Sequence, residues 1–324
     1  MPENKFLNAV FLDLASVDQA DLDLTLLTQQ ASHWRFYPHT DSAQVLDTIA
    51  DAEVVVSNKV VLNAETIAQA KNLKLICVAA TGTNNIDLKA AEERQIPVCN
   101  VTAYGTDSVV QHVFRLLLAL TGRLNENHHA ALSGEWSKSP FFCVLDYPPV
   151  EISGKTMGIV GHGELGKAVA KMAEAFGMKV LLAARDKNDN RKDRIQLHEL
   201  LPQIDVLSLH CPLTAENRNL IAALELELLP EHAILINAAR GGLVDEEALL
   251  TALKEKKIAA AGLDVLSQEP PAQDHHLLNC QLDNLLITPH IAWASQQARQ
   301  RLVNEIAYNI QAYQEGRERN AVII

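Results

Sequence analysis

Short apolar runs alternate with helical patterns of apolar residues in the first part of the chain. The apolar runs predict buried strands at residues 9–12, 54–56, 75–79 and 97–101. Between them, helical periodicity predicts helices at residues 43–50, 64–70 and 86–94. Strands that alternate with helices in this way are typical of a parallel sheet, so this part predicts an α/β domain.

A long apolar helix is predicted next. Ser108 and Gln111 have the spacing of a capping box, and the residues from Val109 to Leu120 are mostly apolar. A helix that is apolar on most of its faces is expected to be buried. The following stretch, residues 134–149, is rich in aromatic residues and proline and is expected to be irregular.

A second alternating series begins after Lys155. Its apolar runs predict strands at residues 156–160, 179–183, 206–209, 234–237, 260–263 and 285–288. Six strands are the full number for a dinucleotide-binding sheet. A final amphipathic helix, at residues 295–314, follows the sixth strand, and we expect it to return to the first domain.

A glycine-rich hexapeptide, Gly161-His162-Gly163-Glu164-Leu165-Gly166, fits the pattern G-x-G-x-x-G. It directly follows the predicted strand 156–160 and opens a predicted helix at residues 164–176, which is the context that the pattern needs. Gly161 would form the tight turn, Gly163 would let the backbone approach a pyrophosphate, and Gly166 would let the helix pack on the strand. The helix N-terminus would add N–H donors and a positive dipole end. A plain glycine turn is the alternative, but the six-strand context favours a dinucleotide site.

The end of the second strand of this series bears on the choice of cofactor. In NAD-binding sheets an acidic residue at the end of this strand holds the ribose hydroxyls. Here Ala184 stands at the expected position, and Arg185 directly follows it. A small residue followed by arginine would admit a 2′-phosphate and could bind it, so the sequence favours NADP over NAD. Two alternatives stay open. Asp186 could turn back to the ribose or pair with Arg185, and Arg185 could be a solvated surface arginine.

Together these patterns predict an α/β protein of two doubly wound parallel-sheet domains. The first is a flavodoxin-like, discontinuous substrate domain made of residues 1–102 and 291–324. The second is a Rossmann NAD(P)-binding domain made of residues 103–290.

Three predicted strand ends carry the residues that keto-acid chemistry needs. Arg240 follows the fourth strand of the second domain, Glu269 lies beyond the fifth, and His290 follows the sixth. Arginine clamps a carboxylate and polarises a keto oxygen, and histidine donates a proton to the developing alkoxide. A glutamate paired to the histidine stabilises its charged form. Each residue alone has a structural explanation, but together at three strand ends they predict an active site.

At these residues the chain resembles the D-isomer-specific 2-hydroxyacid dehydrogenase family, over essentially its whole length. Arg240, Glu269 and His290 match the catalytic residues of that family, and the hexapeptide matches its dinucleotide fingerprint. The resemblance implies that backbone amides of Thr81 and Gly82 hold the substrate carboxylate and that Trp293 forms a pocket wall. It further implies that Asp264 faces the nicotinamide carboxamide. The residues expected to bind the cofactor are Gly161, Gly163, Glu164, Leu165, Gly166, Arg185, Cys211, Pro212, Ala238, Asp264 and His290.

Within that family, residues 134–140, 146–148 and 290–295 most resemble the glycerate dehydrogenase (hydroxypyruvate reductase) branch. The resemblance implies reduction of hydroxypyruvate or glyoxylate by NAD(P)H, with His290 as proton donor, and a homodimer that buries the long helix and residues 136–147. Gln111 stands where many members have glutamate. A non-catalytic NAD(H)-sensing scaffold and a short phosphoglycerate dehydrogenase remain alternatives, whereas Glu269 argues against formate dehydrogenase, which has glutamine there.

Composition limits the classes of molecule that the chain is expected to bind. A net charge of -12 disfavours nucleic acid and anionic membranes, because the most basic stretch, 185–194, is interrupted by three aspartates. A small-molecule substrate is therefore expected.

The cysteines and the N-terminus bear on the cellular compartment. Five cysteines, an odd number without a CxxC motif, are typical of reduced thiols in the cytoplasm, and the N-terminus lacks a signal-peptide pattern. Adjacent histidines at 128–129 and 275–276 lack completing ligands, so no metal site is predicted.

Overall fold

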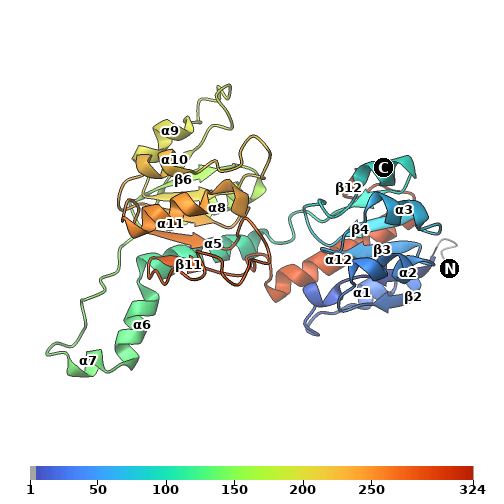
Figure 1. Cartoon of the computed structure of the whole chain (residues 1–324), viewed down its shortest axis with the longest axis horizontal. Helices are drawn as coiled ribbons and strands as arrows, with labels where there is room; N and C mark the ends of the chain where they lie inside the picture. Colours follow the sequence, from blue (N-terminus) through green and yellow to red (C-terminus); the bar gives the residue numbers. More distant parts are fainter. Residues whose placement is uncertain (1–4, 324) are drawn as a thin grey trace. The chain divides into compact units, whose positions relative to one another are not determined.

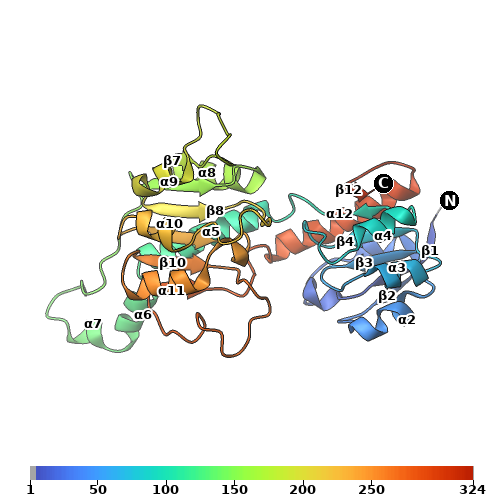
Figure 2. The same cartoon turned by 45° about the horizontal axis from the view of Figure 1, so that its top comes forward.

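The computed structural model describes residues 5 to 323 and divides into two compact units (Figure 1, Figure 2). One unit joins the chain up to Gly105 with the chain from Trp293 onward, and the other spans Thr106–Ala292. These dividing points lie a few residues after the positions 102 and 290 that the sequence suggested.

The first unit is built on one sheet with the strand order β12-β5-β4-β3-β1-β2. Its strands are β1 (Phe6–Phe11), β2 (Ala31–Phe36), β3 (Val54–Ser57), β4 (Leu75–Val78), β5 (Val98–Cys99) and β12 (Ala321–Ile323). All neighbours are parallel except β12, which runs antiparallel to β5. The order of β1 to β5 is that of a flavodoxin-like sheet, as predicted. The sequence did not predict β2 and β12, the two edge strands.

Helices cover both faces of this sheet. They are α1 (Thr25–Thr28), α2 (Val45–Ile49), α3 (Ala64–Gln69), α4 (Leu88–Glu93) and α12 (Gln296–Gln314), with 3₁₀ turns at Leu14–Ser16 and Ser42–Gln44. Successive residues of β1 point to opposite faces: Phe11 packs in a cluster with α12, and Val10 packs in a cluster with α2, α3 and α4. Burial on both faces explains why the central strands read as continuous apolar runs.

The second unit contains a fully parallel sheet with the order β11-β10-β9-β8-β6-β7. Its strands are β6 (Thr156–Val160), β7 (Lys179–Leu182), β8 (Val206–Leu209), β9 (Ile234–Asn237), β10 (Ala260–Leu263) and β11 (Leu285–Ile287). Ile195 forms an isolated parallel bridge with Ala183, at the end of β7. This bridge stands in the place of the third strand of a Rossmann sheet, so β8 to β10 take the fourth to sixth places and β11 is an added strand.

The helices of this unit are α5 (Thr106–Thr121), α6 (Leu124–Leu132), α7 (Glu135–Lys138), α8 (Glu164–Ala175), α9 (Leu197–Leu200), α10 (Ala223–Leu228) and α11 (Glu246–Lys254), with 3₁₀ turns at Leu201–Gln203 and Gly241–Leu243. The prediction that Ser108 caps the long helix is wrong, because α5 begins at Thr106. Ser108 lies inside the helix, and its Oγ donates a hydrogen bond to the carbonyl of Ala292 at 2.7 Å.

An arm made of α6, α7 and the loop after them extends from the sheet of the second unit (Figure 1). The sequence predicted an irregular stretch here but not α6, whose residues form no clear apolar face. Trp136 Nε1 donates to the carbonyl of Phe142 at 2.8 Å, which ties α7 to the loop. Within residues 5–323, no helix has both the length and the apolar character that crossing a membrane requires.

Candidate active site

The glycine-rich loop lies between β6 and α8, and its geometry requires glycine at Gly161 and Gly166. Gly161 has φ +93°, and a Cβ there would lie 2.5 Å from the backbone nitrogen of Cys211. A Cβ at Gly166 would lie 2.0 Å from the carbonyl oxygen of Gly161, so helix and strand pack too closely for a side chain. Gly163 is exposed, and a Cβ there would meet nothing within 4 Å. The loop therefore leaves an open backbone surface at the N-terminus of α8, which fits a dinucleotide pyrophosphate. Glu164 and Leu165 form the first turn of that helix.

The end of β7 is rich in positive charge. Arg185 is exposed, and its backbone N–H donates to Asp189 Oδ2 at 2.8 Å. Asp186 accepts from the backbone of Asn188 at 2.8 Å, which leaves it in a turn of its own. Among the described residues, no carboxylate lies within ion-pair distance of the Arg185 guanidinium, so the anticipated pairing with Asp186 does not occur.

A second arginine at this edge, Arg194, was not predicted from the sequence. The bridge at Ile195 brings Arg194 beside the end of β7, and its guanidinium donates to Nδ1 of His162 at 3.2 Å. The Arg194 side chain is only 5% exposed and also pairs with Asp193. Burial, with the nearby Arg194 and Lys167, lowers the pKa of His162, so this imidazole stays neutral and can accept the hydrogen bond. The only sequence signal for Arg194 was its place in a basic stretch.

The ends of β8 and β9 supply further residues at the same edge of the sheet. Cys211 and Pro212 follow β8, and the Cys211 backbone lies against Gly161. Burial raises the pKa of the Cys211 thiol, so it is a neutral packing group rather than a nucleophile. Ala238 follows β9 and is half-buried.

Arg240 lies two residues beyond Ala238, in a turn held by the side chain of Asn237. That amide donates to the Arg240 carbonyl at 2.9 Å and accepts from the N–H of Ala239 at 3.0 Å. The guanidinium of Arg240 is exposed and donates to the carbonyl of Ala239 at 2.7 Å. An exposed guanidinium without a carboxylate partner among the described residues is suited to binding an anionic ligand.

Glu269 and His290 form a pair, as their predicted roles require. Oε2 of Glu269 lies 2.6 Å from Nδ1 of His290, and Oε1 accepts from the N–H of Leu266 at 2.9 Å. About a third of each side chain is exposed, with values of 34% for Glu269 and 36% for His290. Burial opposes ionisation of Glu269, but the hydrogen bonds from His290 and Leu266 outweigh it and hold its pKa below the usual value. Because Glu269 is hydrogen-bonded to Nδ1 of His290, the proton that His290 delivers must leave from Nε2.

Asp264 also lies at this edge, but its carboxylate is fully enclosed. It accepts hydrogen bonds from Thr288 Oγ1 at 2.6 Å and from the backbone amides of Ile291 at 3.0 Å and Ala292 at 2.8 Å. His112 Nε2 lies 3.3 Å from the same carboxylate. Burial opposes ionisation of Asp264, but these hydrogen bonds together hold its pKa below the usual value. Neither His112 nor Thr288 was assigned a role from the sequence.

The remaining predicted site residues belong to the first unit. Thr81 and Gly82 follow β4, and Thr81 Oγ1 donates to the carbonyl of Val101 at 2.9 Å. Their backbone N–H groups donate to no other residue in the described part of the chain, so they are available to an anion. Trp293 is half-buried and makes an edge-to-face contact with Tyr104, with ring centroids 6.3 Å apart.

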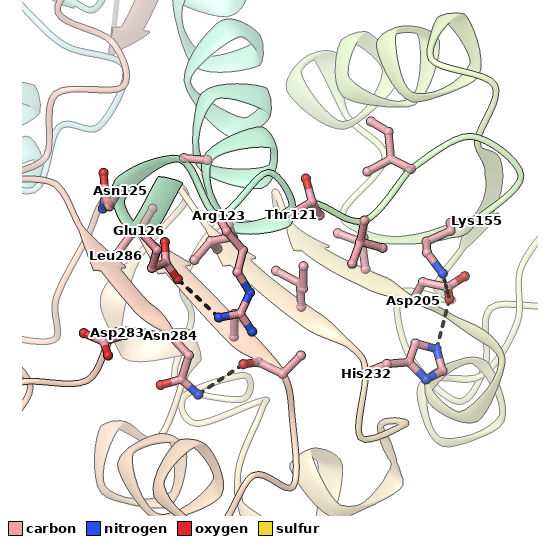
Figure 3. A pocket seen from close by; sticks show the side chains of 18 residues that line it. Thr121, Arg123, Asn125, Glu126, Lys155, Asp205, His232, Asp283, Asn284 and Leu286 are labelled. Carbon is pink, nitrogen blue, oxygen red and sulfur yellow. Dashed lines mark hydrogen bonds and ion pairs between the residues drawn. The ribbon is translucent and has the colours of Figure 1, made fainter. Parts of the chain in front are cut away.

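The opposite edge of the second unit's sheet carries a cavity of about 220 Å³. Its lining includes residues that directly precede strands, among them Lys155, Asp205 and Asn284. Figure 3 shows Lys155 and His232 both beside Asp205. Nζ of Lys155 lies 3.3 Å and Nε2 of His232 lies 2.9 Å from Oδ1 of Asp205. The predicted site residues follow strands instead, so this cavity is separate from them.

The histidine pairs form no metal centre. His128 and His129 are exposed on α6, and His275 and His276 stack on one another at 4.7 Å. Across residues 5–323, no three histidine, cysteine, aspartate or glutamate side chains gather in a way that could hold a metal ion.

Comparison with known proteins identifies the family. Residues 114–292 match the model of the D-isomer specific 2-hydroxyacid dehydrogenase NAD binding domain. The chain belongs to the D-isomer specific 2-hydroxyacid dehydrogenases. Like other members, this dehydrogenase is an oxidoreductase with a nicotinamide cofactor.

Two relatives are similar over most of their length. The dehydrogenase is 42% identical to a glycerate dehydrogenase of Methylorubrum extorquens over 308 residues, 94% of this chain and 97% of the relative. It is 39% identical to a hydroxypyruvate reductase of Blautia hydrogenotrophica, over 87% of this chain and 88% of the relative. Among solved structures, an Aquifex aeolicus D-lactate dehydrogenase with NAD and lactic acid is 30% identical, with a TM-score of 0.79 and coverage of 95% and 96%. Both the α/β fold and the family predicted from the sequence are thus confirmed.

Proposed function

We propose that this dehydrogenase reduces hydroxypyruvate, and glyoxylate as a smaller analogue, to the D-2-hydroxy acid. The observation that carries the proposal is the Glu269–His290 pair at 2.6 Å on the sheet edge that also bears Arg240 and the glycine-rich loop. The similarity to a glycerate dehydrogenase and to a hydroxypyruvate reductase supports the choice of substrate.

His290 is the general acid. A nicotinamide cofactor held at the glycine-rich loop would supply the hydride that reduces the keto carbon. As the carbonyl electron pair moves to the oxygen, that oxygen takes the proton from Nε2 of His290. His290 is then neutral and regains a proton from solvent, while Glu269 keeps the ring oriented and stabilises the protonated form through Nδ1. In the reverse direction the neutral imidazole accepts the proton from the hydroxyl group.

Arg240 and the first-unit amides bind the anionic end of the substrate. The Arg240 fork donates two parallel hydrogen bonds to the carboxylate or polarises the keto oxygen, which places positive charge where negative charge develops. The N–H groups of Thr81 and Gly82 bind the carboxylate, and Trp293 forms an apolar wall of the pocket.

The cofactor is NADPH in preference to NADH. Ala184 leaves no carboxylate at the end of β7 to hold ribose hydroxyls or to repel a 2′-phosphate. Arg185 places an exposed guanidinium at that edge, which is suited to binding a 2′-phosphate. Arg194 lies beside it but is buried and already paired with Asp193 and His162, so the preference rests on Arg185.

The decisive experiment is a panel of 2-keto acids run with both cofactors. We expect kcat/KM to be highest for hydroxypyruvate, lower for glyoxylate, and lowest for pyruvate and 3-phosphohydroxypyruvate. His290→Ala is the control for non-enzymatic oxidation of the cofactor. A maximum at 3-phosphohydroxypyruvate would instead assign a short phosphoglycerate dehydrogenase. Tight cofactor binding without turnover of any keto acid would assign a non-catalytic NAD(H)-sensing scaffold.

The proposed partner is a second copy of this chain. The arm exposes many apolar side chains, namely Leu124, Leu132, Trp136, Phe141, Phe142, Leu145 and Val150. Such a concentration is costly in water and is typical of a surface that another protein covers, and symmetric dimers are the commonest soluble oligomers. Light scattering should give twice the mass of the chain at micromolar concentration. Phe141→Ser combined with Phe142→Ser should shift the protein toward monomer, whereas Val61→Ser, at an exposed apolar residue of the first unit, should not.

A further inference from the structure

His112 is a buried polar residue whose contacts converge on the segment that carries His290. It lies in α5 with its side chain only 4% exposed, and Nε2 is 2.8 Å from Thr288 Oγ1 and 3.3 Å from Asp264 Oδ1. Thr288 Oγ1 in turn donates its hydrogen to Asp264 at 2.6 Å. Because that hydroxyl hydrogen is already used, Nε2 of His112 must be the donor to Thr288.

The segment at the end of this chain of hydrogen bonds needs support. His290 has φ +53°, in the left-handed region that residues other than glycine rarely adopt. Such a conformation persists only where its surroundings hold it. Asp264 holds it at three points: its carbonyl accepts from the N–H of His290 at 2.8 Å, and its carboxylate accepts from the amides of Ile291 and Ala292.

α5 supports the same segment at a second place. Ser108 and His112 are four residues apart and lie on one face of the helix. Ser108 Oγ donates to the carbonyl of Ala292 at 2.7 Å, and His112 binds Thr288, so one helix face holds both ends of residues 288–292. His290 lies between those two anchors.

We propose that His112 is a positioning residue for the general acid: through Thr288 and Asp264 it fixes the backbone conformation that presents His290 to the substrate. The proposal rests on the proposed role of His290. It also assigns the Asp264 carboxylate to this support rather than to the nicotinamide carboxamide, because its side chain is 0% exposed and its oxygens are engaged by the chain itself.

Variants of His112 and Thr288 test the proposal. These residues are the first two members of the relay, the chain of hydrogen bonds from His112 through Thr288 to Asp264. His112→Leu removes the donor, and Thr288→Val removes the hydroxyl with little change of volume. We expect either change to lower kcat about ten- to a hundredfold, because displacement of a reacting group by about 1 Å costs that much. The Kd of NADH and NADPH, measured by fluorescence, should change less than about twofold, since no removed atom is proposed to touch the cofactor. The double variant should be little worse than either single one, because both break the same relay.

Two controls separate positioning from general destabilisation. His112→Gln can place an amide N–H near the position of Nε2, and it should recover most of kcat. Val113→Ala removes buried volume at the next position of α5, and it should lower Tm while leaving kcat near the parent value. If His112→Leu does not fold, Thr288→Val and His112→Gln still decide the outcome.

Each result has one meaning. Parent-like kcat in Thr288→Val and His112→Leu, with His290→Ala inactive, would overturn the positioning role and leave the proposed function intact. An active His290→Ala variant would overturn both. If Asp264→Asn raises the cofactor Kd and leaves kcat unchanged, Asp264 contacts the nicotinamide carboxamide. That result would overturn the supporting role that the proposal assigns to Asp264.

Discussion

Glu269 binds Nδ1 of His290 at 2.6 Å and the backbone of Leu266 at 2.9 Å, so the carboxylate is anchored before it orients the imidazole. The backbone of His290 is held from the other side by Asp264. A general acid that is fixed at both its ring and its backbone can donate a proton from one defined nitrogen, here Nε2.

Glu269→Gln should lower kcat for reduction of the keto acid. The hydrogen bonds from His290 and Leu266 hold the pKa of Glu269 below its usual value, so the carboxylate is ionised at neutral pH. A neutral amide stabilises the protonated imidazole less and orients the ring less firmly, so a loss of about tenfold or more in kcat is expected. A parent-like kcat in Glu269→Gln at neutral pH would separate Glu269 from this role.

Arg240→Lys should damage substrate binding without damaging the fold. Lysine keeps the charge but loses the planar fork, so KM for the keto acid should rise and kcat should fall. A loss of about ten- to a hundredfold in kcat/KM is expected from the strength of charge-assisted hydrogen bonds. Tm should stay near the parent value, because the guanidinium is exposed and its contact is to the neighbouring Ala239 carbonyl. Parent-like kinetics would make Arg240 a structural residue.

Cofactor choice should follow the charges at the end of β7. Ala184→Asp should weaken NADPH binding and shift preference toward NADH. Arg185→Ala should weaken NADPH binding by about tenfold or more while changing NADH binding little, since a phosphate–arginine contact contributes about 1.5–3 kcal/mol. Equilibrium Kd for both cofactors is the measurement, and Lys187→Ala is the control in the same exposed loop. A parent enzyme that prefers NADH, or equal weakening of both cofactors, would contradict the 2′-phosphate interpretation.

His210 should make the apoenzyme less stable in mild acid. Burial lowers its pKa from 6.5 to about 4, and its Nδ1 is enclosed without a hydrogen-bond partner in the described chain. Between these values the unfolded chain binds a proton that the folded chain does not, so the free energy of unfolding falls as pH drops from about 6.5 to about 4. The loss of stability from this group is on the order of 3 kcal/mol.

Urea unfolding of the parent and of His210→Gln, at neutral pH and near pH 5, tests this contribution. The variant should lose less stability between the two pH values, because glutamine does not titrate. An equal loss in both proteins would assign the acid sensitivity to other groups.

The limits of the sequence are clear at particular elements. Strands β6, β8, β9 and β10 were predicted with the bounds that the structure has, because strands buried on both faces are continuous apolar runs. β2 was missed because this edge strand mixes polar and apolar residues, and β12 was missed because it has only three residues. Ser108 fits a helix start by local pattern, but its hydroxyl contacts Ala292, which is 184 positions away in the chain.

By itself, the sequence determined the two α/β series, the glycine-rich loop and the three strand-end residues Arg240, Glu269 and His290, because each depends on local pattern or short spacing. Only the tertiary structure placed Arg194 against His162, and His112 against Thr288 and Asp264. His112 and Thr288 are 176 positions apart, and no periodicity or motif encodes such a contact. The contact between His112 and Thr288 exists because the sheet brings the ends of separate strands together and α5 packs against the sheet. This arrangement gives the buried imidazole of His112 the hydrogen-bond partners that it needs.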